Sequence, residues 1–310
     1  MQPSTTSPLP NHNVVVFSGG GTRGIAFAGA LEELRLQGID WGLRCPKLHT
    51  VAGCSIGAMT ALLVCLGFSA HEVSQLVLNT PFDHLVSLDP MHILRVLTEG
   101  LLGLDPGHVL RDWLAKQISR KTTLDLSQAK RLTLGELAEK TGMALACVAT
   151  NLETRQPMML SSRSTPDVIV VDAVQASMAL PPLFRPVEIL GTLYSDGGLV
   201  NNFPINFFDE HEVLGLRLSS TPQTLPEIQA MRLPLLGFTN YVIRIASSSN
   251  DSNAWESLPV TLRETRVITI HCGKVSTFES DVSAVKDLLL QAGTTAVKKF
   301  LQSHTSRLTL

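Results

Sequence analysis

The sequence predicts a single α/β domain with a mostly parallel central sheet covered by helices on both faces, a three-layer α/β/α arrangement. Residues 14–17 form a continuous apolar run rich in valine, which is typical of a strand buried on both faces. Helical spacing of apolar residues follows over residues 25–37 and stops at Gly38, a residue that favours a helix C-terminus. A second apolar strand followed by a helix lies at residues 49–66. This alternation is typical of parallel α/β sheets.

A helix-rich, insert-like region is expected next, at residues 70–135. Its clearest amphipathic segment covers residues 109–118. Turn-forming residues interrupt the region at Pro81, Pro90 and Asp105-Pro106-Gly107.

The second half of the chain returns to strands and ends in a helix at residues 283–301. We expect an irregular segment at 219–253, with a mobile surface loop at its Ser/Asn-rich end, 247–253. No internal repeat and no interdomain linker is evident, so residues 14–310 are expected to form one domain. The expected strands are 143–149, 158–160, 168–171, 187–194, 213–218 and 267–271.

The composition argues against several classes of function. The 310 residues are 44% hydrophobic and 17% charged, with a net charge of −2 and a mean hydropathy of +0.19. Such a charge does not favour nucleic-acid binding. No run reaches the roughly 18–20 apolar residues needed to cross a bilayer, so any membrane contact is expected to be apolar and local. Residues 1–13 are rich in Ser, Thr and Pro and read as a disordered lead-in without a secretory signal.

The five cysteines indicate neither a disulfide framework nor a zinc site, because their number is odd and no CxxC spacing occurs. Three of them lie in apolar runs and are expected to be buried reduced thiols. A reducing, cytoplasmic compartment is therefore expected. The cysteines are at positions 45, 54, 65, 147 and 272.

A Gly-x-Ser-x-Gly pattern surrounds Ser55, which lies between Gly53 and Gly57, after a predicted strand and before an apolar helix. A corner this tight brings backbone against backbone, so side chains at the two flanking positions would collide. The following helix points its free N–H groups and the positive end of its dipole at the serine. The pattern alone also arises by chance, but its strand-turn-helix context favours a serine nucleophile.

The glycine-rich loop GGGTRG at residues 19–24 has two interpretations. It matches the Gly-x-Gly-x-x-Gly pattern of dinucleotide sites, which place an acidic residue at the end of the next strand. Asp40 does not fit that place, because it directly follows the helix.

We therefore favour an oxyanion loop, in which the N–H groups of Gly19, Gly20 and Gly21 bind the developing negative charge of an acyl-transfer reaction. One such donor typically contributes about 3–4 kcal/mol to the transition state. Arg23 is expected either to meet a substrate phosphate or to support the loop beside Gly24, with an ordinary surface ion pair as the alternative.

A serine nucleophile needs a base, and the sequence offers two kinds. Nine histidines are present, of which His211 and His271 lie near predicted strands. Asp196 is the better candidate, because it ends a predicted strand and because Gly197 and Gly198 let the chain turn away from it. An ordinary Asp-Gly turn is the alternative. An aspartate with the usual pKa of about 3.9 is a weak base, so this one must be desolvated and hydrogen-bonded to the hydroxyl.

The motifs GGGTRG, GCSIG and SDGG, in this order, resemble those of the patatin-like phospholipase family. The resemblance implies a patatin-like fold and a lipid acyl hydrolase with a Ser–Asp dyad, without catalytic histidine, metal or cofactor. Carried over by motif, Ser55 is the nucleophile and Asp196 the base, while Gly20 and Gly21 lead the oxyanion donors. Asn151 departs from the commonest family pattern, which has Asp there. Similar stretches occur at 148–154, 176–184, 201–204 and 273–301, so the resemblance covers nearly the whole chain.

The implied substrate is a phospholipid or another acyl lipid, cut in the manner of a phospholipase A or lysophospholipase. Such substrates lie in an interface, so we expect a transient membrane surface as partner and a cytoplasmic location with peripheral membrane association. The resemblance leaves open whether a protein activator takes part. Apolar segments that could line the site or contact the membrane, with core packing as the alternative, are 101–104, 180–184, 233–238 and Phe203 with Phe207-Phe208.

Three other functions compete with this interpretation. The first is a histidine-dependent α/β-hydrolase esterase that uses Ser55 with His211 or His271. The second is a catalytically silent module that keeps the fold and binds lipid or regulates another protein. Dinucleotide binding at the glycine loop is the third and least favoured.

Overall fold

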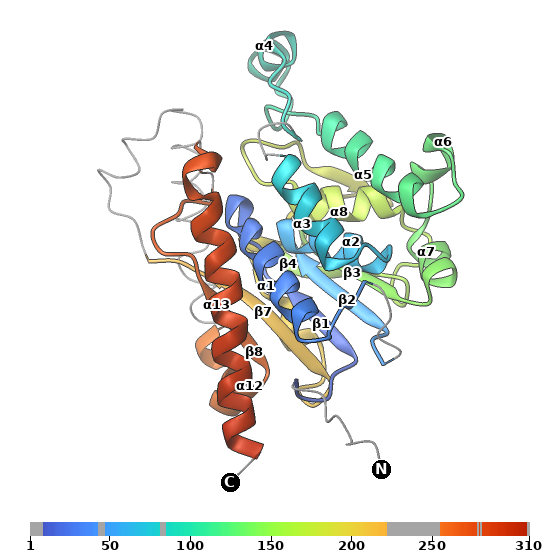
Figure 1. Cartoon of the computed structure of the whole chain (residues 1–310). Coiled ribbons are helices and arrows are strands. Elements are labelled where there is room, and N and C mark those ends of the chain that lie inside the picture. Colours follow the sequence, from blue (N-terminus) through green and yellow to red (C-terminus); the bar gives the residue numbers. More distant parts are fainter. Residues whose placement is uncertain are drawn as a thin grey trace.

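A computed structural model describes residues 9–42, 47–80, 85–221, 255–277, 279 and 281–308. Its centre is an eight-stranded sheet in the order β5-β6-β3-β2-β1-β7-β8, with β4 also paired to β3 (Figure 1). Strands β3, β2, β1, β7 and β8 run parallel, whereas β4, β5 and β6 pair antiparallel. The strands are β1 (Val14–Phe17), β2 (Thr50–Cys54), β3 (Ala144–Asn151), β4 (Gln156–Ser161), β5 (Val187–Ile189), β6 (Thr192–Asp196), β7 (Val213–Ser219) and β8 (Val267–His271).

Helices cover the sheet, and most of them pack on one face (Figure 1). None of the described helices is long and apolar enough to cross a bilayer. The region 70–135 contains helices α3 to α6 and the start of α7. The helices and short 3-10 turns (η) are η1 (Gly21–Gly24), α1 (Ile25–Leu36), α2 (Ile56–Cys65), α3 (Ala70–Asn79), α4 (Pro90–Glu99), α5 (His108–Lys121), α6 (Leu126–Ala129), α7 (Leu134–Thr141), α8 (Val170–Met178), η3 (Gly197–Leu199), η4 (Pro204–Phe207), α12 (Val260–Thr265) and α13 (Val282–Leu308).

The side chains of each central strand alternate between two apolar cores. In β1, Val15 and Phe17 pack in the larger core, together with α1, α2, α8 and α13. Val14 and Val16 pack in the smaller core, to which η4 and α12 contribute. Because both faces are covered, the strand is apolar at every position, as its sequence indicated. The α/β class with a mostly parallel sheet is thereby confirmed.

Two expected strands are wrong in their extent. The segment 168–171 was expected as a strand, but α8 begins at Val170, and Ile169 makes only an isolated bridge to Thr133. Burial of α8 against the sheet overrides the β-propensity of this valine-rich run. The segment 187–194 is a hairpin, since the chain turns at Leu190 and Gly191, both of which have positive φ.

The other expected elements are found close to their predicted bounds, and α13 extends the terminal helix to residue 308. Of the expected lead-in, residues 9–13 lie against the domain. Leu9 is buried, and the Asn13 N–H donates to the Glu212 carbonyl over 2.9 Å. Residues 222–253 of the expected irregular segment, with the expected mobile loop at 247–253, lie outside the described residues, and so do Cys45 and the break at Pro81. The other four cysteines are buried, and none of them forms a disulfide with another described residue.

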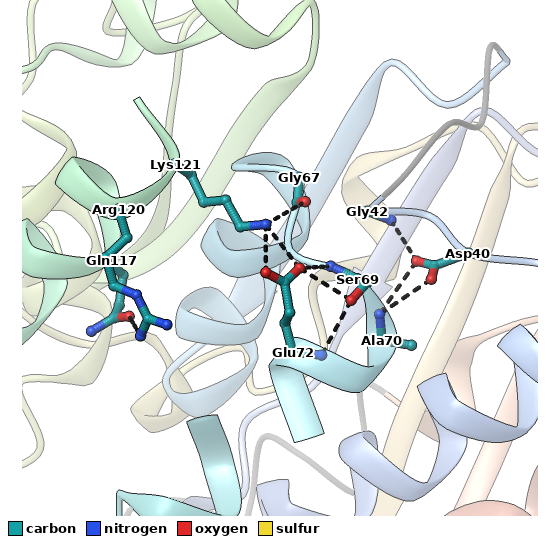
Figure 2. A network of polar contacts seen from close by, with 9 residues as sticks. All are labelled: Asp40, Gly42, Gly67, Ser69, Ala70, Glu72, Gln117, Arg120 and Lys121. Atoms are coloured by element: carbon teal, nitrogen blue, oxygen red, sulfur yellow. Dashed lines mark hydrogen bonds and ion pairs between the residues drawn. The ribbon is translucent and has the colours of Figure 1, made fainter. Parts of the chain in front are cut away.

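A polar network fixes α2, α3 and α5 to one another where α2 ends (Figure 2). The Lys121 ammonium donates to the Gly67 carbonyl over 3.3 Å and to both carboxylate oxygens of Glu72 over 2.8 Å. It also lies 4.6 Å from the centre of the Phe68 ring. Glu72 in turn accepts the Ser69 N–H over 2.8 Å and completes a capping box at the start of α3. This network holds the far end of the helix whose first turn follows Ser55.

Candidate active site

Ser55 occupies a strained corner between β2 and α2. Its φ of 54° and ψ of −125° lie outside the regions that residues other than glycine usually adopt. A Cβ atom on Gly57 would collide with the carbonyl oxygens of β1 and its following residue, and one on Gly53 would collide with the backbone of Gly57. The Ser55 N–H donates to the Ser177 hydroxyl over 3.0 Å, and this hydroxyl donates to the Val148 carbonyl over 2.6 Å. The corner is therefore held from both sides.

The pairing along β3 brings Ser55 next to Asp196. β4 pairs with residues 146–151 of β3, so β2 and β6 must share the other edge, with β2 on 144–148 and β6 on 149–151. Cys54 lies opposite Val148 and Asp196 opposite Ala149, which means that the two strands meet end to end. The Cys54 thiol accordingly donates to Asp196 Oδ1 over 3.9 Å. Both chains turn away at this junction, one into α2 and the other into η3.

The Asp196 carboxyl is buried, with 2% of the residue exposed. Burial raises its pKa to about 6, against hydrogen bonds from the Gly198 N–H, the Ser55 hydroxyl and the Cys54 thiol, which lower the pKa. The Gly198 N–H donates to Oδ1 over 2.7 Å. Gly197 leaves no room for a side chain, because a Cβ there would collide with the Val148 carbonyl. The carboxyl thus has the desolvation and the hydrogen bonding that a weak base needs in order to act on a hydroxyl.

The glycine loop lies against the serine. A Cβ built on Gly19 would be 3.4 Å from the Cβ of Ser55. The N–H of Gly19 donates to the Asn202 carbonyl over 2.9 Å, so it is occupied, contrary to its expected role as an oxyanion donor. The N–H groups of Gly20 and Gly21 have no acceptor among the residues that the structure describes. Two of the three expected donors are therefore available.

Arg23 and Gly24 support this loop. The guanidinium of Arg23 donates to the Gly20 carbonyl over 3.2 Å, to the Ser220 hydroxyl over 2.6 Å and to the Thr277 hydroxyl over 2.9 Å. It ties the loop to the chain segments that follow β7 and β8. A Cβ on Gly24 would collide with Ile56, so α1 packs closely on the start of α2. Of the two roles expected for Arg23, these contacts favour loop support over phosphate binding.

A narrow apolar pocket of about 30 Å³ adjoins the loop and the first turns of α2. Its walls come from the glycine loop, α2, α3 and the start of α13. Its volume is that of one or two water molecules, so it does not hold a fatty-acyl chain in this conformation. The lining includes Gly21, Ile56, Met59, Val77 and Leu85.

The rival candidates lie elsewhere. The Asp40 carboxylate accepts the N–H groups of Gly42 and Ala70 and so belongs to the network at the far end of α2, not to the glycine loop (Figure 2). His211 precedes β7, at the opposite end of the parallel strands from Ser55. His271 lines a groove between β8 and α13. Within the described ranges, no three His, Cys, Asp or Glu side chains gather as metal ligands would.

The apolar segments take different places. Residues 180–184 contribute a small buried cluster, and Phe203 belongs to the smaller core, whereas Phe207 and Leu102 are exposed. Residues 233–238 lie outside the described part of the chain.

Sequence reasoning assigned no role to three residues that hold the site together. Ser177 and Asn202 bind the backbone of Ser55 and Gly19, and the Thr277 carbonyl accepts the N–H of Thr22 over 2.8 Å. Ser177 and Asn202 do lie in stretches that carry the family resemblance. Their contacts, however, join positions far apart in the chain, and no local pattern indicates them.

Comparison with known proteins agrees with this geometry. A family model described as patatin-like phospholipase matches residues 15–209. An uncharacterized protein of Acanthamoeba polyphaga mimivirus is 25% identical over 304 residues, which cover 96% of this chain and 97% of the relative. The probable lipid hydrolase 463L of Invertebrate iridescent virus 6 is 28% identical over 198 residues, which cover 63% of this chain and 62% of the relative.

The crystal structure of VipD from Legionella pneumophila resembles the fold with a TM-score of 0.61 at 19% sequence identity, covering 95% of this chain and 67% of that one. The family model matches more than half of the chain. The protein belongs to the patatin-like phospholipase family.

Proposed function

We propose that this protein is a lipid acyl hydrolase of the phospholipase A or lysophospholipase type, which cleaves ester-linked fatty acids through an acyl-serine intermediate. The observation that carries the proposal is the junction on β3, where β2 and β6 meet and make Ser55 a neighbour of the buried Asp196. The family and the relative named a probable lipid hydrolase support a lipid substrate.

The proposed reaction proceeds in two steps. Asp196 accepts the hydroxyl proton as Ser55 Oγ attacks the ester carbonyl carbon, and the N–H groups of Gly20 and Gly21 bind the resulting oxyanion. The tetrahedral intermediate expels the lysolipid or alcohol, which takes the proton from Asp196. Water then attacks the acyl-serine with Asp196 again as base. The bond between the acyl carbon and Ser55 Oγ breaks, Oγ takes the proton from Asp196, and the fatty acid leaves. The strained φ of Ser55 and the N-terminus of α2 keep the hydroxyl oriented through both steps.

The proposal is tested by analysing the products formed from mixed phospholipid vesicles by mass spectrometry. The wild-type protein is expected to release free fatty acid and the matching lysolipid, and Ser55→Ala is expected to release neither. A fluorophosphonate probe should label the wild-type protein at Ser55 only. A folded wild-type protein that neither reacts with the probe nor releases fatty acid would instead be a silent lipid-binding module.

The pH dependence of hydrolysis should follow the carboxyl of Asp196. The base must be ionised, and burial raises its pKa to about 6. We therefore expect kcat/KM for a soluble ester to fall about tenfold per pH unit below pH 6 and to be level above about pH 7. Cys54→Ala removes a hydrogen bond that lowers this pKa, so the midpoint should move to higher pH. A midpoint near pH 4, as for an ordinary aspartate, would contradict the assignment.

A further inference from the structure

The apolar side chains described in helix α4 belong to none of the apolar clusters formed by the described residues. Five of its ten residues are Met, Ile, Leu or Val, yet no side chain described in this helix is buried. Met91 is 64% exposed and Leu94 52%, and Leu88 and Leu102, just outside the helix, are exposed as well. Met91 and Leu94 are three residues apart in α4, so they lie on one side of the helix, and Leu88 precedes its N-cap residue Asp89. A short amphipathic helix of this kind is stable when its apolar side packs on something.

The segment 86–104, called the α4 excursion below, is held firmly at its base. Asp105 is completely buried and its carboxylate accepts the Ser87 N–H and the Gly107 N–H, each over 2.7 Å. The His92 ring bonds to the Gly103 carbonyl over 3.2 Å, which links the helix to the returning chain. Figure 1 shows α4 at the top of the view, standing apart from the helices that cover the sheet. The excursion is a projecting element with a fixed foot.

The foot of the excursion adjoins the candidate active site. The N–H groups of Leu104 and Asp105 donate to the Leu183 carbonyl over 2.9 and 2.8 Å. Ala179 lies in the same segment, residues 179–184, and its carbonyl accepts the Asp196 N–H over 3.0 Å. Val86 packs against this segment in the cluster that also includes Leu199, three residues after Asp196. One short stretch of chain therefore touches both the excursion and the candidate base.

A further exposed leucine, outside the excursion, lies at the end of the sheet where Ser55 leaves β2. β6 runs antiparallel to β3 with Tyr194 opposite Asn151, the last residue of β3. The β5–β6 turn therefore extends beyond the C-terminal end of β3, where Ser55 also leaves the sheet. Leu190 lies in this turn and is exposed. The α4 excursion and the β5–β6 turn thus both present apolar side chains near the end of the sheet at which Ser55 lies.

We propose that the α4 excursion docks the protein on a lipid surface by inserting the side chains of Leu88, Met91 and Leu94 among the acyl chains. The proposal rests on the proposed function, since a lipid substrate is reached only from such a surface. Electrostatic attraction to anionic lipid is not expected to contribute to this binding. Arg95 pairs with Glu99 over 3.0 Å, and the excursion has no excess of positive charge. Binding should therefore occur on zwitterionic vesicles and depend little on salt.

The test is co-sedimentation with phosphatidylcholine vesicles of full-length protein that carries Ser55→Ala, so that the lipid is not consumed. Adding Met91→Ser and Leu94→Ser is expected to lower the vesicle partition coefficient at least about tenfold. The matched control adds Leu36→Ser and Val260→Ser, which are 64% and 58% exposed, and is expected to change it less than about twofold. Leu36 ends α1 and Val260 begins α12, so neither belongs to the excursion. Leu88→Ser with Leu102→Ser is the second variant if the first does not fold.

Two results would overturn the proposal: unchanged partitioning of both excursion variants, or an equal loss in the control. If unchanged partitioning comes with conversion of a dimer to a monomer, α4 is an interface between copies of this chain. With Ser55 intact, the excursion variants should hydrolyse a soluble short-chain ester at the wild-type rate but vesicles more slowly. If the wild type hydrolyses nothing while the excursion controls binding, only the proposed function fails; if hydrolysis depends on Ser55 while binding ignores α4, only the docking fails.

Discussion

Replacing Asp196 by asparagine, or Ser55 by alanine, is expected to lower kcat for ester hydrolysis by about 10⁴-fold or more. Alanine removes the nucleophilic oxygen. Asparagine keeps the shape of the side chain and can still accept the Gly198 N–H, but it cannot take up the hydroxyl proton. Because the two groups act in one step, the double variant should be little worse than either single variant. The measurement is initial rates on a soluble ester, so that lipid binding does not enter.

The stability of Asp196→Asn separates lost chemistry from lost folding. The pKa of Asp196 is raised from 3.8 to about 6 in the folded protein, so between these values the folded state binds more protons than the unfolded state. The contribution of this group to stability therefore falls as the pH rises from about 4 to about 6, and it stays low above that range. Asparagine carries no charge, so at pH 8 the variant is expected to be more stable than the wild type, on the order of 1–3 kcal/mol. Denaturant unfolding at pH 4 and pH 8 measures this difference.

His211→Gln and His271→Gln are the matched controls for the dyad. His211 precedes β7 at the opposite end of the sheet from Ser55, and His271 ends β8, three strands from β2 in the sheet. Neither substitution should therefore change kcat by more than about twofold. Loss of activity in either variant would favour the histidine-dependent esterase. Near-normal turnover by folded Asp196→Asn would contradict the role of the carboxylate as base.

Gly21→Ala is expected to lower kcat by about 10²–10³-fold, with little change in KM for a soluble ester. Gly21 has a φ of 56°, and a Cβ on it would collide with the Thr277 carbonyl. The loop must therefore shift, and the N–H of Gly20, of Gly21 or of both moves away from the oxyanion. Such donors act on the transition state more than on the bound ester, which is why kcat should carry the loss.

Gly142→Ala is the control for backbone strain. Gly142 has a φ of 71° at the end of α7, and a Cβ there would meet nothing within 4 Å. The substitution should cost about 1 kcal/mol of stability and leave kcat unchanged. If Gly21→Ala also leaves kcat within a few-fold of the wild type, the glycine loop is not the oxyanion site.

The features that local rules describe could be predicted along the chain. The corner at Ser55 follows from two glycines between a strand and a helix, and the buried strands follow from apolar runs. Prediction was wrong where packing outweighs local preference, as in the valine-rich start of α8. It also missed the turn at Leu190 and Gly191, because a single glycine within an apolar run is a weak turn signal and leucine is not a residue that usually adopts a φ of 51°.

The amino-acid sequence alone was sufficient for the α/β class, for the position of the serine corner and for the choice of Asp196 as the candidate base, because each depends on neighbouring residues. Only the folded chain shows that β2 and β6 meet end to end on β3, that the Gly19 N–H is occupied by Asn202, and that the pKa of Asp196 is raised. Strand register and desolvation arise from contacts between distant segments. They exist only when the whole sheet and its covering helices have assembled.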